Sequence, residues 1–346
     1  MNSREARLTD LIEQMIAKSG TGTLLSVSAP LHGLDWRGAI GGFARDGEQP
    51  LTVADGFRIA SMSKTFTATL VMMEAEAGNL RLGDRLERFF DAALIARAHP
   101  DASSITLRHL LNHTAGLWDF ALHQEWSREI RRDPARFREP QEILEWAIGH
   151  GEPVGPVGGA HVYSDTGYVL LGRALEILTG QTYAELCRSR IFEPLAMEHT
   201  WLEGHEQPRS SLSHCYAGDW DALVLNGCLD WAAGGHVSTL DDLDKFLKGL
   251  FRDQSLVTPE SLDLMLTTVP TPNHHYGLGV RLRHEHVPGA PATHERFWGH
   301  AGHWGSFMYY VPGLRATICG TENVAGLDHR WVFEVILEIL DDASTS

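Results

Sequence analysis

The pattern of apolar and polar residues changes character three times along the chain. The N-terminal stretch repeats apolar residues at helical spacing with charges opposite them. This pattern predicts an amphipathic helix and not a signal peptide, because no continuous apolar run is present. The apolar positions are Leu8, Leu11, Ile12, Met15 and Ile16. Two strand-like runs follow at 22–30 and 36–45, and the short turn between them predicts an antiparallel hairpin. Residues 51–59 predict a further short strand.

From about residue 81 to residue 240, strand signals nearly vanish and helical periodicity replaces them. The predicted helices are 107–112, 141–148, 168–178 and 183–191. Strand patterns then return, and a final apolar stripe predicts a closing helix. The strands are 276–283, 297–299, 306–311 and 315–320, and the helix is 328–340. Between them, the segment 284–295 contains Pro288, Gly289 and Pro291 and predicts a surface loop.

The order of strands, then helices, then strands predicts an α/β (α+β) fold. Both chain ends, 1–60 and 241–346, would build one antiparallel sheet flanked by helices. The mainly helical middle, 61–240, would be an inserted domain. We expect the active site in the cleft between these two parts.

Composition narrows the classes of partner. The chain has 346 residues and a formal net charge of −16, which argues against nucleic acid and against an anionic membrane surface. No stretch has the apolar length needed to span a bilayer. The four cysteines are scattered without paired spacing, which favours reduced thiols in a cytoplasmic protein.

The first candidate for chemistry is the pair Ser61 and Lys64, three residues apart at the start of a helix and therefore on one face. The run Thr65–Met73 carries no charge, and a helix that is apolar all round is a buried helix. Burial beside a hydroxyl penalises the ammonium form, the condition under which a lysine accepts a proton. The chain contains four lysines, so lysine at 64 in an arginine-rich chain supports a tunable amine.

Tyr163 and Asp165 form the second candidate group, after the glycine- and proline-rich segment 151–159 and before a helix. A tyrosine on such a loop tip is well placed to relay a proton, and a phenol beside a lysine is expected to have a depressed pKa. The alternative for Tyr163 is a half-buried packing residue. Asp165 is equally suited to be the N-cap of the helix 166–178, and both roles can hold together.

The third group is the glycine-rich segment 299–305, which contains His300, Gly302 and His303. Glycines in a strand-like segment indicate close approach of another group, and substrate is the natural candidate. A zinc site is the rival interpretation, since His109 and His113 are four apart and His300 and His303 three apart. We expect no metal, because the Glu of an H-E-x-x-H motif and an evident third ligand are both missing.

Three motifs in this order resemble the serine β-lactamase and penicillin-binding-protein superfamily, in particular its class C-like branch. That branch contains esterases, D-aminopeptidases, D-amino acid amidases and DD-carboxypeptidases. The motifs are Ser61-Met62-Ser63-Lys64, Tyr163-Ser164-Asp165 and His300-Ala301-Gly302. Three further segments are similar to segments of the branch: LLNHTAGL at 110–117, AGGHVST at 233–239 and YGLGV at 276–280. The resemblance covers about residues 8–340.

The resemblance implies a two-step acyl transfer on a small ester or amide, without a cofactor. Ser61 would attack the carbonyl, and Lys64 and Tyr163 would handle its proton. The backbone N–H groups of Ser61 and His303 would form the oxyanion hole, beside Gly302. His300 would line the strand side and contact substrate or the Tyr163 hydroxyl. Oligomeric state and substrate identity are not implied.

Two departures from the family pattern bear on substrate. Asp165 stands where the family usually has asparagine, so a carboxylate would either stabilise protonated Lys64 or attract a free ammonium on the substrate. The second role would suit D-amino acid amides or D-aminopeptidase substrates. Histidine instead of lysine at 300 argues against carboxylate-bearing β-lactams.

Several functions remain open at this point. A carboxylesterase stands beside the amidase or aminopeptidase. The alternatives are a DD-carboxypeptidase or β-lactamase-like activity and, in another class, a non-catalytic sensor that keeps the fold.

Overall fold

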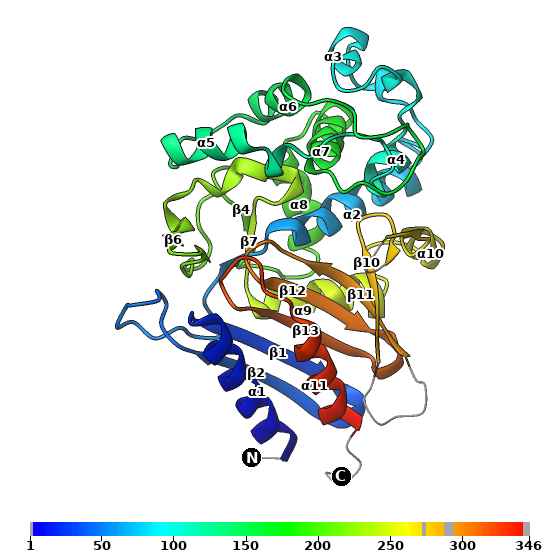
Figure 1. The fold of residues 1–346 in the computed structure, drawn as a ribbon. Coiled ribbons are helices and arrows are strands. Elements are labelled where there is room, and N and C mark those ends of the chain that lie inside the picture. Colours follow the sequence, from blue (N-terminus) through cyan, green and yellow to red (C-terminus); the bar gives the residue numbers. More distant parts are fainter. Residues whose placement is uncertain (1–2, 272–274, 287–293, 342–346) are drawn as a thin grey trace.

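The computed structural model describes residues 3–271, 275–286 and 294–341 (Figure 1). Within these residues the main sheet has eight strands in the order β2-β1-β13-β12-β11-β10-β9-β8, and every neighbouring pair is antiparallel. Its strands are β1 (Thr23–Ala29), β2 (Leu34–Ile40), β8 (Val269–Pro270), β9 (His275–Tyr276), β10 (Arg281–His286), β11 (His294–Ala301), β12 (Ser306–Val311) and β13 (Ala316–Thr321). The predicted sheet, built from both chain ends, is confirmed.

Helices cover both faces of this sheet. The N-terminal helix α1 (Ser3–Ser19) and the C-terminal helix α11 (Arg330–Asp341) lie side by side on one face, and α9 (Leu240–Leu247) lies on the other (Figure 1). Side chains alternate between the two cores along each strand, so Phe307 and Tyr309 pack under α1 and α11 while Met308 and Tyr310 join the larger core. This packing on both faces explains why every residue of β12 is buried.

The helical part of the chain lies beyond the other face. Its helices are α2 (Ser63–Glu76), α3 (Ala92–Ala96), α4 (Leu107–Leu111), α5 (Gln124–Arg132), α6 (Pro140–Gly149), α7 (Asp165–Thr179), α8 (Tyr183–Cys187) and α10 (Pro259–Met265). The helix α2 passes between the sheet and the other helices (Figure 1). Its threonine hydroxyls hydrogen-bond to carbonyls, as when Thr65 donates to Gly279 and Thr67 to Ala232. A helix with little charge can therefore lie in the core without unsatisfied hydroxyl groups.

Four segments differ from the sequence prediction. The expected strand at 51–59 shrinks to β3 (Phe57–Arg58), which joins β7 (His236–Ser238) and β4 (Trp201–Leu202) in a separate small sheet. The expected strand 276–283 is broken by a turn at Gly279, whose φ of +72° no β-branched residue adopts easily. The predicted loop 284–295 is shorter, because β10 and β11 extend into it, and Pro288, Gly289 and Pro291 lie outside the described residues. The helix predicted at 183–191 ends at Cys187 and continues as a π-helical turn to Phe192.

The remaining structural features concern short strands, cysteines and membrane contact. A third, two-stranded sheet pairs β5 (Tyr216–Ala217) with β6 (Trp220–Asp221). The four cysteines are buried free thiols. In the part of the chain that the structure describes, no helix has the length and apolar character required to cross a membrane.

Candidate active site

Ser61 lies on a 3₁₀ turn (Ala60–Met62) that leads directly into α2. Ala60 has a φ of +46°, a left-handed conformation that is unfavourable for a residue with a side chain. Such strain is often held at functional sites by the surrounding structure. The turn presents Ser61 to a cavity of about 790 Å³ that is also lined by Tyr163, Asp165, Gly302 and His303. The three predicted groups of residues therefore meet in one cavity.

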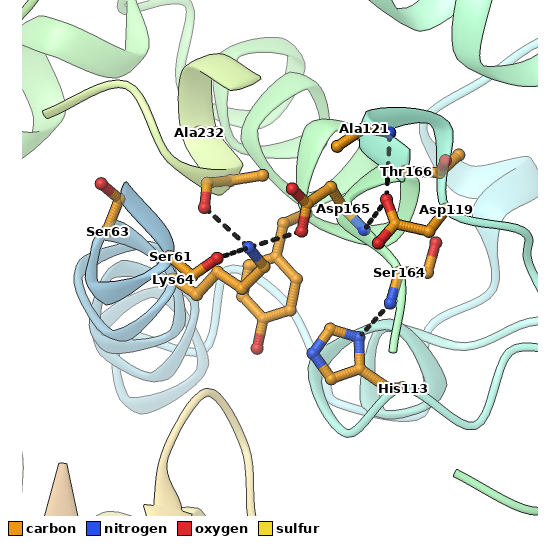
Figure 2. A network of polar contacts seen from close by, with 12 residues as sticks. Ser61, Ser63, Lys64, His113, Asp119, Ala121, Ser164, Asp165, Thr166 and Ala232 are labelled. Atoms are coloured by element: carbon orange, nitrogen blue, oxygen red, sulfur yellow. Dashed lines mark hydrogen bonds and ion pairs between the residues drawn. The ribbon is translucent and has the colours of Figure 1, made fainter. Parts of the chain in front are cut away.

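Lys64 is completely buried one helical turn after Ser61. Its Nζ lies 3.0 Å from the Ser61 Oγ and 2.6 Å from the Asp165 Oδ1 (Figure 2). It also lies 2.8 Å from the Ala233 carbonyl oxygen. These three acceptors match the three N–H bonds of an ammonium group. Lys64 is therefore held as a fully bonded cation, with the serine hydroxyl as one of its partners.

Tyr163 packs its ring against this cation, with 4.9 Å between the ring centroid and the Lys64 Nζ. Burial and, second, the negative charge of Asp165 raise the pKa of Tyr163 well above its usual value. The expectation of a depressed phenol pKa is therefore wrong, since the neighbouring carboxylate and burial outweigh the cations. The Tyr163 hydroxyl is buried, and its hydrogen bond with the Ser61 side chain acts against the rise in its pKa. It is a neutral donor available to a group in the cavity.

The turn that carries Tyr163 and Asp165 is held by the segment before α5. The Nδ1 of His113 accepts the backbone N–H of Ser164 at 3.1 Å (Figure 2), and the Ser164 hydroxyl donates to the Trp118 carbonyl at 2.7 Å. Burial and the nearby Lys64 charge lower the pKa of His113 well below its usual value, so its ring stays neutral. His113, considered above as half of a metal pair, thus positions the Tyr163 loop.

The sequence analysis expected Asp165 to be the N-cap of α7. In the structure, Asp165 is instead the first residue of this helix. Ser164 takes the cap position, and the Asp165 carboxylate, 8% exposed, faces Lys64 instead. A carboxylate in the first turn of a helix is also favoured by the helix dipole. The cap prediction is therefore wrong by one residue, and the pairing of Asp165 with Lys64 is confirmed.

Two carboxylates that the sequence analysis did not select, Asp119 and Asp230, line the same cavity. The Asp119 Oδ1 accepts the N–H groups of Ala121 at 3.1 Å and of Asp165 at 3.3 Å (Figure 2). Burial first, and then the charge of Asp165, raise the pKa of Asp119 to about 8 and that of Asp230 to about 7. Three carboxyl groups, those of Asp119, Asp165 and Asp230, therefore lie near one lysine in this part of the cavity.

Gly302 and His303 lie at the end of β11, on the opposite wall of the cavity from α7. A Cβ at Gly302 would come within 2.3 Å of both the Ile59 carbonyl oxygen and the Ser306 Oγ. The sequence analysis expected substrate to approach this glycine closely. Its close neighbour in the structure is the chain just before Ser61. The contact brings the backbone of His303 near the serine, where an oxyanion hole would require it.

His300 does not line the cavity. It is completely buried, and its Nε2 lies 3.0 Å from the hydroxyl of Tyr276. The ring centroids of His300 and Tyr163 are 6.5 Å apart. The expected place of His300 on the cavity wall is therefore wrong. Strand alternation turns its side chain to the face of β11 that it shares with Met308, towards the larger core, where its ring lies next to those of Tyr163 and Tyr276.

The histidines at 109, 113, 300 and 303 were the candidates for a metal site. Within the described residues, no group of three or more His, Cys, Asp or Glu side chains is arranged to hold a metal ion. His109 contributes to the capping of α4 and His113 to the Tyr163 turn. These histidines have structural partners that account for them.

Fold and cavity together define a protein of the β-lactamase/transpeptidase type, with a buried serine–lysine pair between a sheet and a helical part. The β-lactamase family model matches residues 32–328, and the chain belongs to this family.

The most similar solved structures include two amide hydrolases. The D-amino acid amidase from Ochrobactrum anthropi SV3 and the D-stereospecific amidohydrolase from Streptomyces sp. superpose with TM-scores of 0.83 and 0.81. Each is 25% identical to this chain, and each alignment covers 99% of both chains.

Curated relatives include penicillin-binding protein 4 of Amycolatopsis lactamdurans, 31% identical over 201 residues, and penicillin-binding protein 4* of Bacillus subtilis, 27% identical over 277 residues. The alignments cover 58% and 72% of this chain, and 49% and 57% of the relatives. The chain thus spans about half the length of the curated relatives it matches.

Proposed function

We propose that the protein is a serine hydrolase that cleaves amides of amino acids with a free α-amino group, through an acyl-enzyme on Ser61. The observation that carries this proposal is the set of contacts around Lys64. One buried amine contacts both the Ser61 hydroxyl and the Asp165 carboxylate, and two further carboxylates face the same cavity. The likeness to the two amide hydrolases supports the same substrate class.

The proton path follows from the contacts. Lys64 gives one proton to Asp165 across 2.6 Å, and its freed lone pair accepts the Ser61 proton across 3.0 Å as Oγ attacks the carbonyl carbon. The neutral Tyr163 hydroxyl protonates the leaving nitrogen and recovers a proton from Lys64. Water then attacks the acyl ester with the same groups in reverse order.

The oxyanion of each tetrahedral intermediate needs two donors that are already in place. The backbone N–H groups of Ser61 and His303 are the candidates, because both residues line the cavity and the Gly302 contact brings their segments together. Preorganised donors of this kind commonly lower a barrier by about 3–4 kcal/mol.

The carboxylates select an amine-bearing substrate. Negative charge exceeds positive charge here when Lys64 is protonated and all three carboxyl groups, those of Asp119, Asp165 and Asp230, are ionised. An ammonium group in the cavity would favour the ionised forms of Asp119 and Asp230, whose pKa values of about 8 and 7 lie above the ordinary value of 3.8. A charge-assisted hydrogen bond of this kind contributes roughly 1.5–3 kcal/mol, or about 10- to 100-fold in affinity.

The cavity also has room for an apolar acyl side chain. One end of the cavity is bounded by α5, by the hairpin of β5 and β6, and by the turn that follows this hairpin. Its apolar lining residues are Leu122, Trp126, Ile130, Trp220, Leu225 and Leu229. Phenylalanyl and leucyl amides are therefore suitable probes.

The test compares D- and L-phenylalanine p-nitroanilides with their N-acetylated forms. We expect hydrolysis of the free-amine compounds, a loss of about tenfold or more on N-acetylation, and no hydrolysis by Ser61→Ala. Ser63→Ala is the matched control, because Ser63 is a buried serine two residues away that does not line the cavity. Fluorophosphonate labelling should be lost in Ser61→Ala and kept in Ser63→Ala. Labelling that persists in Ser61→Ala would refute the acyl-enzyme.

Asp165→Asn separates the two roles of the carboxylate. If Asp165 serves the proton path, the variant loses activity equally on free-amine and N-acetylated substrates. If it contributes mainly to amine recognition, the loss is confined to the free-amine compounds. A variant as active as the native protein on both would contradict both roles.

A further inference from the structure

The imidazole of His303 has no role in the reaction as described so far, although the backbone of this residue does. His303 lies two residues after the end of β11 and lines the cavity that Ser61 and Tyr163 also line. Gly302 packs so closely on the chain just before Ser61 that an added Cβ would meet a carbonyl oxygen at 2.3 Å. The side chain of His303 therefore starts from a fixed point beside the proposed oxyanion hole.

The ring of His303 is held by packing and not by hydrogen bonds. It meets the Trp304 ring edge to face, with 4.8 Å between the ring centroids and 78° between the planes. Within residues 3–271, 275–286 and 294–341, neither of its ring nitrogens forms a hydrogen bond or an ion pair. Partial burial lowers the pKa of His303, and the charge of Asp165 acts against this shift. The ring is therefore neutral at pH 7, and its unprotonated nitrogen is an acceptor without a partner.

The second half of the proposed reaction contains a donor that needs such an acceptor. The water that opens the acyl-enzyme enters where the leaving group departed, beside the Tyr163 hydroxyl. One of its two hydrogens passes along the proton path, and the other has no acceptor among the groups of that path. After burial, the charge of Asp165 acts on the pKa of both Tyr163 and His303, so one carboxylate lies near both side chains. His303 is therefore close to the place where this water must bind.

We propose that the His303 imidazole accepts a hydrogen bond from the water that attacks the acyl-enzyme, and thereby orients this water towards the carbonyl carbon. This inference rests on the proposed function and adds to it a residue that acts in deacylation alone. The water oxygen bonds to the carbonyl carbon as the bond from this carbon to the Ser61 oxygen breaks. One hydrogen of the water replaces the proton that passes through Tyr163 and Lys64 to the Ser61 oxygen, and the other stays on the product acid. His303 neither gains nor loses a proton.

Two groups of the substrate compete with water for the same imidazole nitrogen. These are the α-ammonium group and the N–H of the scissile amide, and both are present before acylation. The three carboxyl groups near Lys64 already supply acceptors for the ammonium. The amide nitrogen leaves with the proton that Tyr163 gives it. A contact with either group would change acylation, whereas a contact with the water changes only the second step.

The experiment offers the acyl-enzyme two nucleophiles at once. The enantiomer of phenylalanine p-nitroanilide that the native protein cleaves is incubated at a fixed concentration of methanol. The initial rates of formation of phenylalanine methyl ester and of phenylalanine give the ratio of methanolysis to hydrolysis. Water has a second hydrogen for His303, while the only hydroxyl hydrogen of methanol is taken by the proton path. Because both products come from one acyl-enzyme, effects of a substitution on acylation or on folding cancel in the ratio.

His303→Leu removes the acceptor and should raise this ratio by about three- to tenfold, the range expected for one hydrogen bond. His303→Gln keeps an acceptor and should stay close to the native ratio. His199→Leu is the matched control, because His199 is an exposed histidine outside the cavity, and it should keep the native ratio. Should His303→Leu fail to fold, His303→Ala gives the same comparison.

The outcomes separate this inference from the proposed function. An unchanged ratio in His303→Leu, including absence of the methyl ester from both proteins, refutes the contact with water. If kcat/KM for release of p-nitroaniline falls at the same time, His303 contacts the substrate instead. An equal rise in His303→Leu and His303→Gln also refutes the contact, since shape and not the acceptor would be the cause. In each of these cases the proposed function stands as long as cleavage depends on Ser61, and cleavage that persists in Ser61→Ala would remove it.

Discussion

The carboxylate Asp119 makes a prediction about stability that can be worked from the structure. Its pKa is raised to about 8, mainly by burial and then by Asp165, whereas an unfolded aspartate has the ordinary value of 3.8. The folded protein therefore keeps this proton over a pH range in which the unfolded chain has lost it. A raised pKa of this kind stabilises the fold at low pH, and the contribution disappears as the pH rises through about 8.

The size of the effect follows from the same numbers. Between pH 5 and pH 8 an isolated group with these two pKa values would lose about 4 kcal/mol, at about 1.4 kcal/mol per pH unit. Asp119 is only half-buried and faces the cavity, so screening by solvent reduces the loss to about 2 kcal/mol. Asp119→Asn keeps both accepted hydrogen bonds and cannot ionise. We therefore expect the variant to match the native protein at pH 5 and to exceed its stability by about 2 kcal/mol at pH 8.

The assay is urea unfolding followed by tryptophan fluorescence at pH 5, 6, 7 and 8. The native curve alone is not diagnostic, because burial lowers the pKa of His236 to about 3 and this gives a pH dependence of the opposite sign. That contribution cancels in the difference between the variant and the native protein. Asp10→Asn, an exposed carboxylate on α1, is the control and should give a flat difference. A flat or falling difference for Asp119→Asn would refute the reasoning.

Two further predictions concern the fold around Ser61. Gly302→Ala should force β11 away from Ile59, because the added Cβ would lie 2.3 Å from its carbonyl oxygen. We expect a loss of about 1–3 kcal/mol in urea unfolding together with a fall in kcat, and a kcat equal to the native value would contradict the oxyanion geometry. Arg58→Ala should cost about 3–5 kcal/mol, because it leaves Glu203, 2.7 Å from the guanidinium, as an uncompensated charge. The double variant Arg58→Met with Glu203→Leu should recover part of this loss, and no recovery would show that the ion pair is not the cause.

The sequence predicted the parts of this protein that depend on local pattern. The uncharged apolar run after Lys64 predicted a buried helix, and α2 is buried. The strand patterns near both chain ends predicted a single sheet, because strands from both ends can bury their apolar faces together in one sheet. Ser61, Lys64 and Tyr163 were found because each belongs to a short motif next to a recognisable element.

The residues that sequence reasoning missed have no local signal. Asp119 and Asp230 lie in different segments, and only the packing of these segments brings them to one cavity. Two of the errors about known candidates have a similar origin. The pKa of Tyr163 depends on burial and on a neighbouring carboxylate, and the direction of His300 depends on the register of β11 with β12. Neither can be inferred from a motif.

The complete burial of Lys64 has a practical consequence for handling the protein. The chain has four lysines, and the other three, Lys18, Lys245 and Lys248, lie on α1, on α9 and just after α9, all on the sheet part of the molecule. Reagents that couple to primary amines would therefore attach the protein to a support through this part and spare the amine beside Ser61. Immobilised molecules would therefore be attached through the sheet part, on either of its faces, with the amine beside Ser61 unmodified.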